Sequence, residues 1–184
     1  MIESLIHKKE TYMNSRTIHI AELAVFTAAA FIFSYIESLF PLPLPFPGMK
    51  LGLANLIIVI VLYQRGFLSA FGVSMVRNVL NAFTFGSLFS FFYSLAGSIL
   101  SLCAMYFLKK NKHPQFSLIG VSAVGGIIHN IGQFLVAVCL VGFSAILNYL
   151  PFLYFAGLIA GVLIGVLANL CMKRLSFLSQ THQQ

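Results

Sequence analysis

The stretch SLFSFFYSLAGSILSLCAMYFLKKNK, residues 87–112, decides the class of fold. It carries no charged residue until Lys109, where three lysines follow within four positions. A helix rises about 1.5 Å per residue, so about 20 apolar residues cross the hydrocarbon core of a bilayer. The charged end suits the membrane–water boundary. The stretch therefore predicts a transmembrane helix.

The composition extends this prediction to the whole chain. Of 184 residues, 59% are hydrophobic and 19 are Phe, and the mean hydropathy is +0.94. Only eleven residues are Lys or Arg and four are acidic, all of them Glu. A soluble core of this size cannot bury so much apolar surface. The composition indicates an integral membrane protein.

Similar apolar runs recur between short polar breaks and predict six transmembrane helices. The expected spans are 18–40, 49–63, 66–85, 87–108, 116–142 and 151–172. The second span is the shortest. We expect an all-α integral membrane protein with a flexible cytoplasmic leader at 1–17, a six-helix membrane domain at 18–175 and a cytoplasmic tail at 176–184. Met13 offers an alternative start to Met1.

The basic residues predict the orientation of the spans. Nine of them fall on one side: Lys8, Lys9, Arg16, Arg65, Lys109, Lys110, Lys112, Lys173 and Arg174. Lys50 falls on the other side and Arg77 lies within a span. By the positive-inside rule both termini are cytoplasmic, in agreement with an even number of spans. The net charge of +7 is then explained by the anionic cytoplasmic leaflet, without a nucleic-acid partner.

A second group of polar residues lies inside the spans and predicts a binding site. Arg77 lies roughly 17 Å from the cytoplasmic end of its span, and His129 roughly 20 Å from that of its own. Steps of three and four place polar residues on one face of each helix. The candidate ligand-binding residues gather in the outer half of the membrane: Glu37, Lys50, Asn55, Arg77, Asn78, Asn81, His129, Asn130 and Gln133.

These residues also admit structural roles. Arg77 cannot lose its proton, so it must meet an anion, carbonyl groups or water. It either faces a cavity that receives a polar ligand group or forms an internal ion pair with Glu37. Asn130 also suits a helix-tying role. The proline-rich loop 41–48 is either a lid over the cavity or a rigid spacer at the membrane surface.

Several enzymatic motifs do not occur. Without Asp, the chain has no Asp-rich magnesium motif for prenyl transfer, and it has no phosphate-binding loop for ATP hydrolysis. We expect no catalytic residue and no metal site. The three cysteines, Cys103, Cys139 and Cys171, are scattered without a CxxC pair and are expected to be small buried apolar side chains.

Several motifs resemble one family. The stretches SYIESLFPLP (34–43), PGMKLGLAN (47–55), FGSLFSF (85–91) and HNIGQ (129–133) resemble the Gx transporter family, also called heptaprenyl diphosphate synthase component I. That family is similar to the S components of energy-coupling-factor vitamin transporters. The resemblance implies a six-helix S-component-like bundle with an outward-facing pocket. It also implies a coupling protein and ATPase subunits as partners, which dock on Ala24 and Ala28.

The resemblance suggests an uptake protein for a flavin, an isoprenoid or quinone-related compound, or another partly polar ligand. It would lie in the cytoplasmic membrane of a bacterium. Gly52 and Asn55 depart from the acidic residue usual in the riboflavin proteins, so the ligand need not be riboflavin. The alternative is a non-catalytic accessory subunit of heptaprenyl diphosphate or menaquinone synthesis, or of a flavin-based electron-transfer complex.

Overall fold

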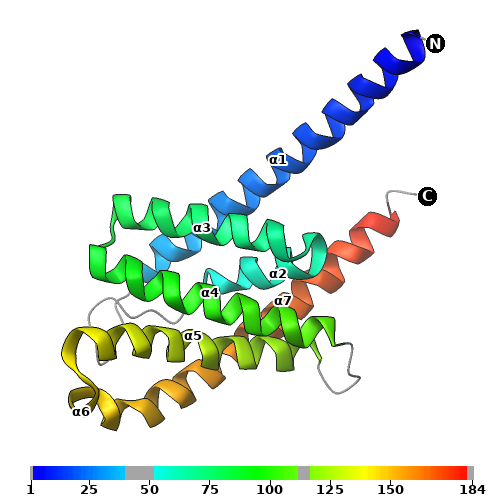
Figure 1. Ribbon diagram of the computed structural model, residues 1–184. Helices are drawn as coiled ribbons and strands as arrows, with labels where there is room; N and C mark the ends of the chain where they lie inside the picture. The colour runs from blue at the N-terminus through cyan, green and yellow to red at the C-terminus, as the bar shows by residue number, and fades with distance from the viewer. Residues whose placement is uncertain (1, 40–51, 112–116, 182–184) are drawn as a thin grey trace.

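A computed structural model describes residues 2–39, 52–111 and 117–181 of the chain. Within these residues every regular element is helical, with six long helices and two short ones (Figure 1). The elements are α1 (Ile2–Leu39), α2 (Asn55–Arg65), α3 (Phe67–Thr84), α4 (Leu88–Lys110), α5 (Leu118–Val141), α6 (Phe143–Ile146), the 3-10 turn η1 (Leu147–Tyr149) and α7 (Leu150–Thr181). The segment expected as a leader is helical from Ile2 onward, and α7 extends into the expected tail.

Four helical stretches in the described residues are long and apolar enough to cross a membrane: Ser15–Leu39, Leu88–Lys110, Leu118–Leu140 and Leu147–Arg174. The helices α2 and α3, which fall largely within the expected spans at 49–63 and 66–85, do not join this group. The first of them starts late, because Gly52 adopts φ +86° and the Asn55 N–H bonds to the Gly52 carbonyl at 2.8 Å. The second, α3, loses hydropathy through Arg77, Asn78 and Asn81.

The short helix α2 forms the centre of the molecule. Its residues from Asn55 to Leu62 are all buried, and it packs against α1, α3 and α7. Apolar residues on every side of a helix indicate burial on every side. The uniformly apolar sequence of α2 is therefore explained by the helices around it rather than by lipid.

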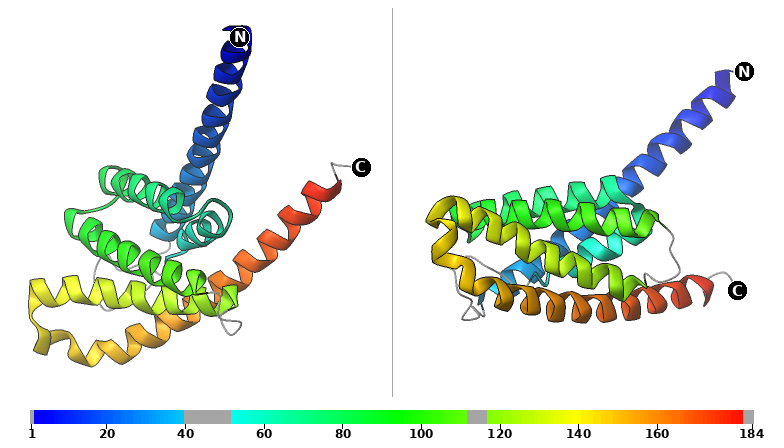
Figure 2. Two further views of the ribbon diagram at one scale, coloured as in Figure 1. Left: turned by 45° about the vertical axis from the view of Figure 1, so that its right-hand side comes forward. Right: turned by 60° about the horizontal axis from the view of Figure 1, so that its bottom comes forward.

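The longer helices pack through close backbone contacts at glycines. A Cβ added at Gly161 would lie 2.6 Å from the Ser122 carbonyl oxygen, and one added at Gly132 would lie 2.8 Å from the Gly97 Cα. The first contact joins α7 to α5 and the second joins α5 to α4. Small residues permit such approaches between membrane helices. Each of the helices α3, α4, α5 and α7 packs against the next in this order, and the glycine contacts set the distances from α4 to α5 and from α5 to α7 (Figure 2).

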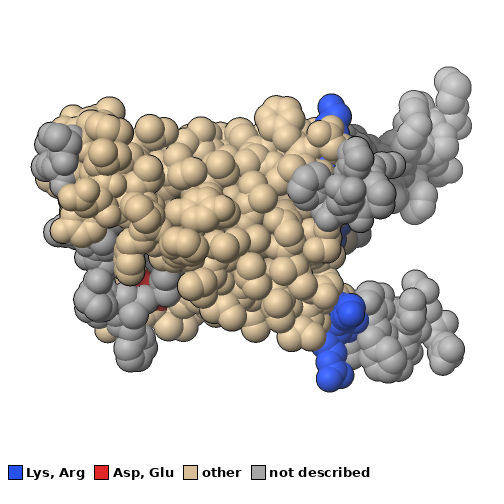
Figure 3. All heavy atoms as spheres, turned by 90° about the horizontal axis from the view of Figure 1, so that it is seen from below, with Lys and Arg blue, Asp and Glu red and all other residues tan. Residues whose placement is uncertain are grey.

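The two ends of the molecule differ in charge. The N- and C-terminal helices emerge at the same end, while α6 lies at the opposite end (Figures 1 and 2). Basic side chains cluster where the termini emerge (Figure 3). At this end Lys109 Nζ donates to the Leu62 carbonyl at 2.7 Å, and Arg65 forms a 2.7 Å ion pair with Glu22. This polarity has the form that the positive-inside rule requires.

Candidate ligand-binding site

Helix α3 carries its polar residues inward and its apolar residues outward. Ser74, Arg77, Asn78 and Asn81 are buried, whereas Phe83 on the opposite side is 89% exposed. The steps of three and four in the sequence correctly predicted this shared face. Such an arrangement is the reverse of a soluble amphipathic helix and suits a helix between lipid and a polar interior.

Arg77 contacts two helices through one end of its guanidinium. Its Nη2 donates to Asn78 Oδ1 at 2.7 Å and to Ser98 Oγ on α4 at 3.1 Å. Asn78 also donates to Ser98 at 3.3 Å and accepts from Ser94 at 2.8 Å. The other part of the guanidinium, Nε, is buried and has no hydrogen-bond partner among the residues that the structure describes. Arg77 therefore joins α3 to α4 and retains a donor for a further group.

His129 occupies the corresponding position on α5. Its Nδ1 lies 3.4 Å from the Asn55 amide nitrogen, and its Nε2 lies 2.9 Å from the Gln133 amide nitrogen. Gly97 of α4 makes room for the ring, since a Cβ there would lie 3.0 Å from His129 Nδ1. The imidazole is thus held between α2, α4 and α5.

Glu37 reaches the site from α1. Its Oε1 accepts a 2.6 Å hydrogen bond from the Gly52 N–H, in the turn that leads into α2. Gly52 also lies against Asn55, because a Cβ on Gly52 would lie 2.8 Å from the Asn55 amide nitrogen. Glu37 therefore ties the outer end of α1 to the start of α2, beside the polar residues of α3 and α5.

These side chains surround a small polar cavity of about 10 Å³. Its lining comprises Ser34, Glu37, Gly52, Arg77, Asn81, Ser94, His129 and Gln133. A volume of this size holds about one water molecule. Within the described part of the chain, three lining residues have a buried polar atom without a partner: Arg77 Nε, Asn81 Oδ1 and Gln133 Oε1. The lining of the cavity therefore includes three residues whose hydrogen-bonding capacity is not fully used.

Most of the predicted site residues meet at this cavity. It is lined by Glu37, Arg77, Asn81, His129 and Gln133. Asn55 contacts His129 and Asn78 contacts Arg77, so both lie directly behind the lining. Asn130 instead donates to the Leu153 carbonyl of α7 at 2.8 Å, as in its helix-tying alternative. Ala24 and Ala28 are exposed on α1. Lys50 and the loop 41–48 lie outside the described residues.

The sequence analysis missed the serines of the site. Ser34 and Ser94 line the cavity, and Ser98 accepts from Arg77. The signal was present, because Ser94, Ser98 and Ser101 follow the same steps of four and three that marked the polar face of α3.

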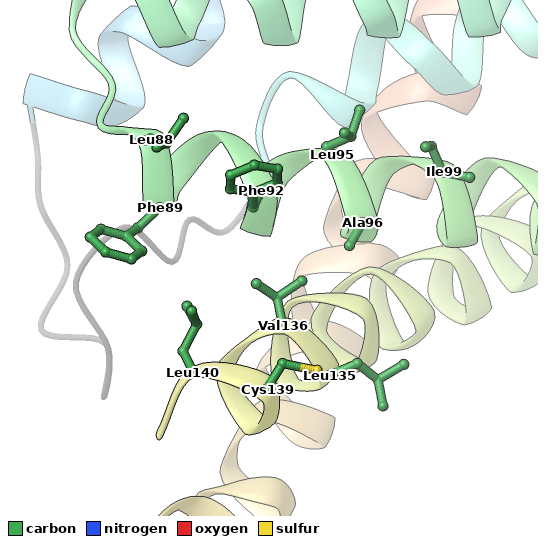
Figure 4. A pocket seen from close by; sticks show the side chains of 10 residues that line it. All are labelled: Leu88, Phe89, Phe92, Leu95, Ala96, Ile99, Leu135, Val136, Cys139 and Leu140. Carbon is green, nitrogen blue, oxygen red and sulfur yellow. The ribbon is translucent and has the colours of Figure 1, made fainter. Parts of the chain in front are cut away.

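A separate apolar groove of about 470 Å³ lies between α4 and α5 (Figure 4). Its side chains are Leu88, Phe89, Phe92, Leu95, Ala96, Ile99, Leu135, Val136, Cys139 and Leu140. Cys139 and Cys171 are exposed, and only Cys103 is partly covered. The prediction that the cysteines are buried was wrong, because a helix in lipid can expose apolar side chains at no cost.

A solved structure defines the class of protein to which this fold belongs. It is reported as "Structure and mechanism of the S component of a bacterial ECF transporter" and matches with a TM-score of 0.70 at 23% identity. The match covers 89% of this chain and 98% of that one. The protein is therefore a multi-pass membrane protein with an S-component-like fold. A comparison with curated proteins gives no match.

The family follows from the sequence itself. The profile described as "Heptaprenyl diphosphate synthase component I" matches residues 26–171, which is most of the chain. The protein belongs to the heptaprenyl diphosphate synthase component I family. The predicted resemblances to this family and to S components are both confirmed.

Proposed function

We propose that the protein binds a small, partly polar molecule within the membrane, as an uptake component of the S-component type. All six long helices cross or enter the bilayer, both termini face the cytoplasm, and the polar cavity opens toward the other face. The ligand is a flavin, an isoprenoid or quinone-related compound, or another molecule with one polar end. No catalytic residue is assigned to the chain.

The observation that carries this proposal is the group of unpartnered buried atoms around one cavity. Arg77 is 3% exposed, yet its Nε has no hydrogen-bond partner in residues 2–39, 52–111 and 117–181, and the same holds for Asn81 Oδ1 and Gln133 Oε1. A buried polar atom without a partner costs about 1–3 kcal/mol. Three such atoms on residues that line one cavity favour a site for a polar group over a purely structural contact between helices.

Ligand entry requires the helices to separate. The cavity holds about one water molecule in the described conformation. Its walls come from α1, α3, α4 and α5, so a ligand enters where the ends of these helices part, away from the basic end. The exposed Ala24 and Ala28 of α1 are the proposed docking surface for a coupling protein, which with ATPase subunits would drive this movement.

The test compares two arginines. The protein is purified in detergent, and small molecules released on denaturation are identified by mass spectrometry. Arg77→Met should lower the bound ligand at least about tenfold, because a charge-assisted hydrogen bond contributes about 1.5–3 kcal/mol. The matched control is Arg65→Met, since Arg65 is exposed and pairs with Glu22 at the basic end. Wild-type protein without any bound compound would contradict the proposal, as would equal retention in both variants.

A second candidate function follows from the family description. An accessory subunit of heptaprenyl diphosphate synthesis would have to hold an isoprenoid chain, and the α4–α5 groove is apolar and about 470 Å³ in volume. Added to a soluble prenyl synthase, the protein should then change product length or rate. Cys139→Trp, which fills the groove, should remove the effect, and Cys171→Trp, on α7 outside the groove, should not.

A further inference from the structure

We infer that a hollow at the basic end of the molecule binds a phospholipid whose headgroup carries both a phosphate and a primary ammonium group. The hollow has a volume of about 430 Å³ and lies between α1 and the end of α2. It is separate from the polar cavity, because Glu22 at the hollow and Glu37 at the cavity are about 22 Å apart along α1, at about 1.5 Å per residue. The inference therefore concerns a second site and does not depend on the proposed function.

The hollow lies at the level of the membrane–water boundary. Arg65 is the last residue of α2, and Gly66, with φ +87°, forms the turn into α3. Lys109 of α4 reaches the same end of α2, where its Nζ donates to the Leu62 carbonyl at 2.7 Å. Helix α1 continues past this turn and away from the other helices (Figures 1 and 2). The hollow is therefore the corner between the outlying part of α1 and the basic end of the bundle, where phospholipid headgroups lie.

The lining of the hollow combines apolar side chains with one ion pair. The apolar part belongs to α1 and includes the exposed side chains of Ile18 and Val25. The polar part consists of Glu22, Gln64 and Arg65. Apolar side chains that a membrane helix exposes lie against lipid chains, which are as apolar as they are. A phospholipid in the corner can thus place its chains against α1 and its headgroup against the ion pair.

The ion pair is complementary to a headgroup with two opposite charges. Arg65 Nη2 donates to Glu22 Oε1 at 2.7 Å, and the two side chains remain 42% and 36% exposed. A guanidinium has five N–H donors and a carboxylate has two oxygens, so this contact leaves both groups able to form further hydrogen bonds. Hydrocarbon offers them no partner, whereas a phosphate can accept from Arg65 and an ammonium can donate to Glu22. The described lining carries one positive and one negative side chain, which favours a headgroup without net charge over an anionic one.

The ammonium group distinguishes the proposed lipid from its relatives. A primary ammonium has N–H donors for the second carboxylate oxygen of Glu22, whereas the trimethylated nitrogen of choline has none. The two headgroups share the phosphate and have the same net charge, so basic residues elsewhere at this end attract them equally. Phosphatidylethanolamine should therefore bind about threefold more tightly than phosphatidylcholine, which is the gain expected from one exposed charged contact.

The experiment measures the binding of these two lipids, with identical acyl chains, to the full chain in detergent by native mass spectrometry. Glu22→Gln should abolish the threefold preference of the wild-type protein, because the ammonium then meets no charge. Glu10→Gln is the matched control and should retain the preference, since it removes the same charge from α1 about 18 Å from Glu22 along the helix. An exposed ion pair contributes little to stability, so Glu22→Gln should fold normally, which thermal unfolding checks.

A third variant tests the hollow itself. Ala21→Trp fills it and should weaken the binding of both lipids. Three results would overturn the inference: equal binding of the two lipids by the wild-type protein, a preference that persists in Glu22→Gln, and binding that Ala21→Trp leaves unchanged. The last result would show that the hollow serves another occupant, such as a helix of a partner protein. The proposed function is judged separately, by the compound that co-purifies with the wild-type protein and by its loss in Arg77→Met.

Discussion

At the scale of single residues, buried polar side chains from several helices meet at one small cavity. Arg77 and His129 lie on different helices, yet both line one cavity with Glu37 of a third helix. The spacing in the sequence predicted that these residues belong to one site and which helical face each occupies. Their partners were not, because a hydrogen bond between α3 and α4 depends on how far each helix is rotated and shifted against the other.

Ser98 and Ser94 of α4 both form hydrogen bonds to the polar face of α3, and Ser98 accepts two of them. The Ser98 hydroxyl accepts from Arg77 at 3.1 Å and from Asn78 at 3.3 Å. Ser98→Ala leaves two buried donors short of an acceptor and should lower the free energy of unfolding by about 1–3 kcal/mol. Denaturant unfolding in detergent measures this change. Ser38→Ala is the control, because that hydroxyl bonds within its own helix to the Tyr35 carbonyl; equal effects of both substitutions would refute the assigned role.

At the scale of elements, glycine contacts set the distances between helices. Gly126 faces Gly157 and Gly161 across the α5–α7 contact, where a Cβ on Gly126 would overlap the Gly157 carbonyl oxygen. The sequence analysis identified the apolar runs and assigned the shortest of them, 49–63, as a transmembrane span, whereas helix α2 covers only Asn55–Arg65. What the sequence could not show is that α2 is surrounded by other helices, which removes the need for a span-length helix in lipid.

The close α5–α7 contact can be tested by replacing one of its glycines. Gly161→Ala places a methyl group 2.6 Å from the Ser122 carbonyl and should destabilise the fold by about 1–3 kcal/mol through overpacking. Gly72→Ala on α3 is the matched control, because no atom lies within 4 Å of its added Cβ. Replacing this helical glycine should stabilise the protein by about 0.5–1 kcal/mol. Opposite signs in thermal unfolding are expected, and destabilisation by both would count against the contact.

At the scale of the whole molecule, the distribution of charge and the arrangement of the helices distinguish the same two ends. Both termini and the clustered basic residues lie at one end, and the turn with α6 lies at the other (Figures 1 and 3). By the positive-inside rule, this distribution of charge predicts that the basic end is cytoplasmic and the opposite end faces outward. The cavity residues Glu37 and Gly52 lie where α1 ends and α2 begins, away from the basic end.

Reporter fusions test this orientation. Alkaline phosphatase folds only outside the cytoplasm, so a fusion after Gly142, between α5 and α6, should be active. Fusions at the C-terminus or after Asn111, beside Lys109 and Lys110, should be inactive, since these positions lie at the basic end. The reverse pattern of activity would show that the protein is inserted the other way round.

The sequence by itself determined the membrane class, the helical content, the family and the polar faces of α3 and α5. These features depend on composition and on local spacing, which each helix expresses independently. Only the tertiary structure decided that α2 is an enclosed short helix and that Asn130 donates a hydrogen bond to α7. It also brought three residues with an unpartnered buried atom to the wall of one water-sized cavity. Those features depend on the approach and rotation of helices distant in sequence, which close glycine contacts set and no single helix encodes.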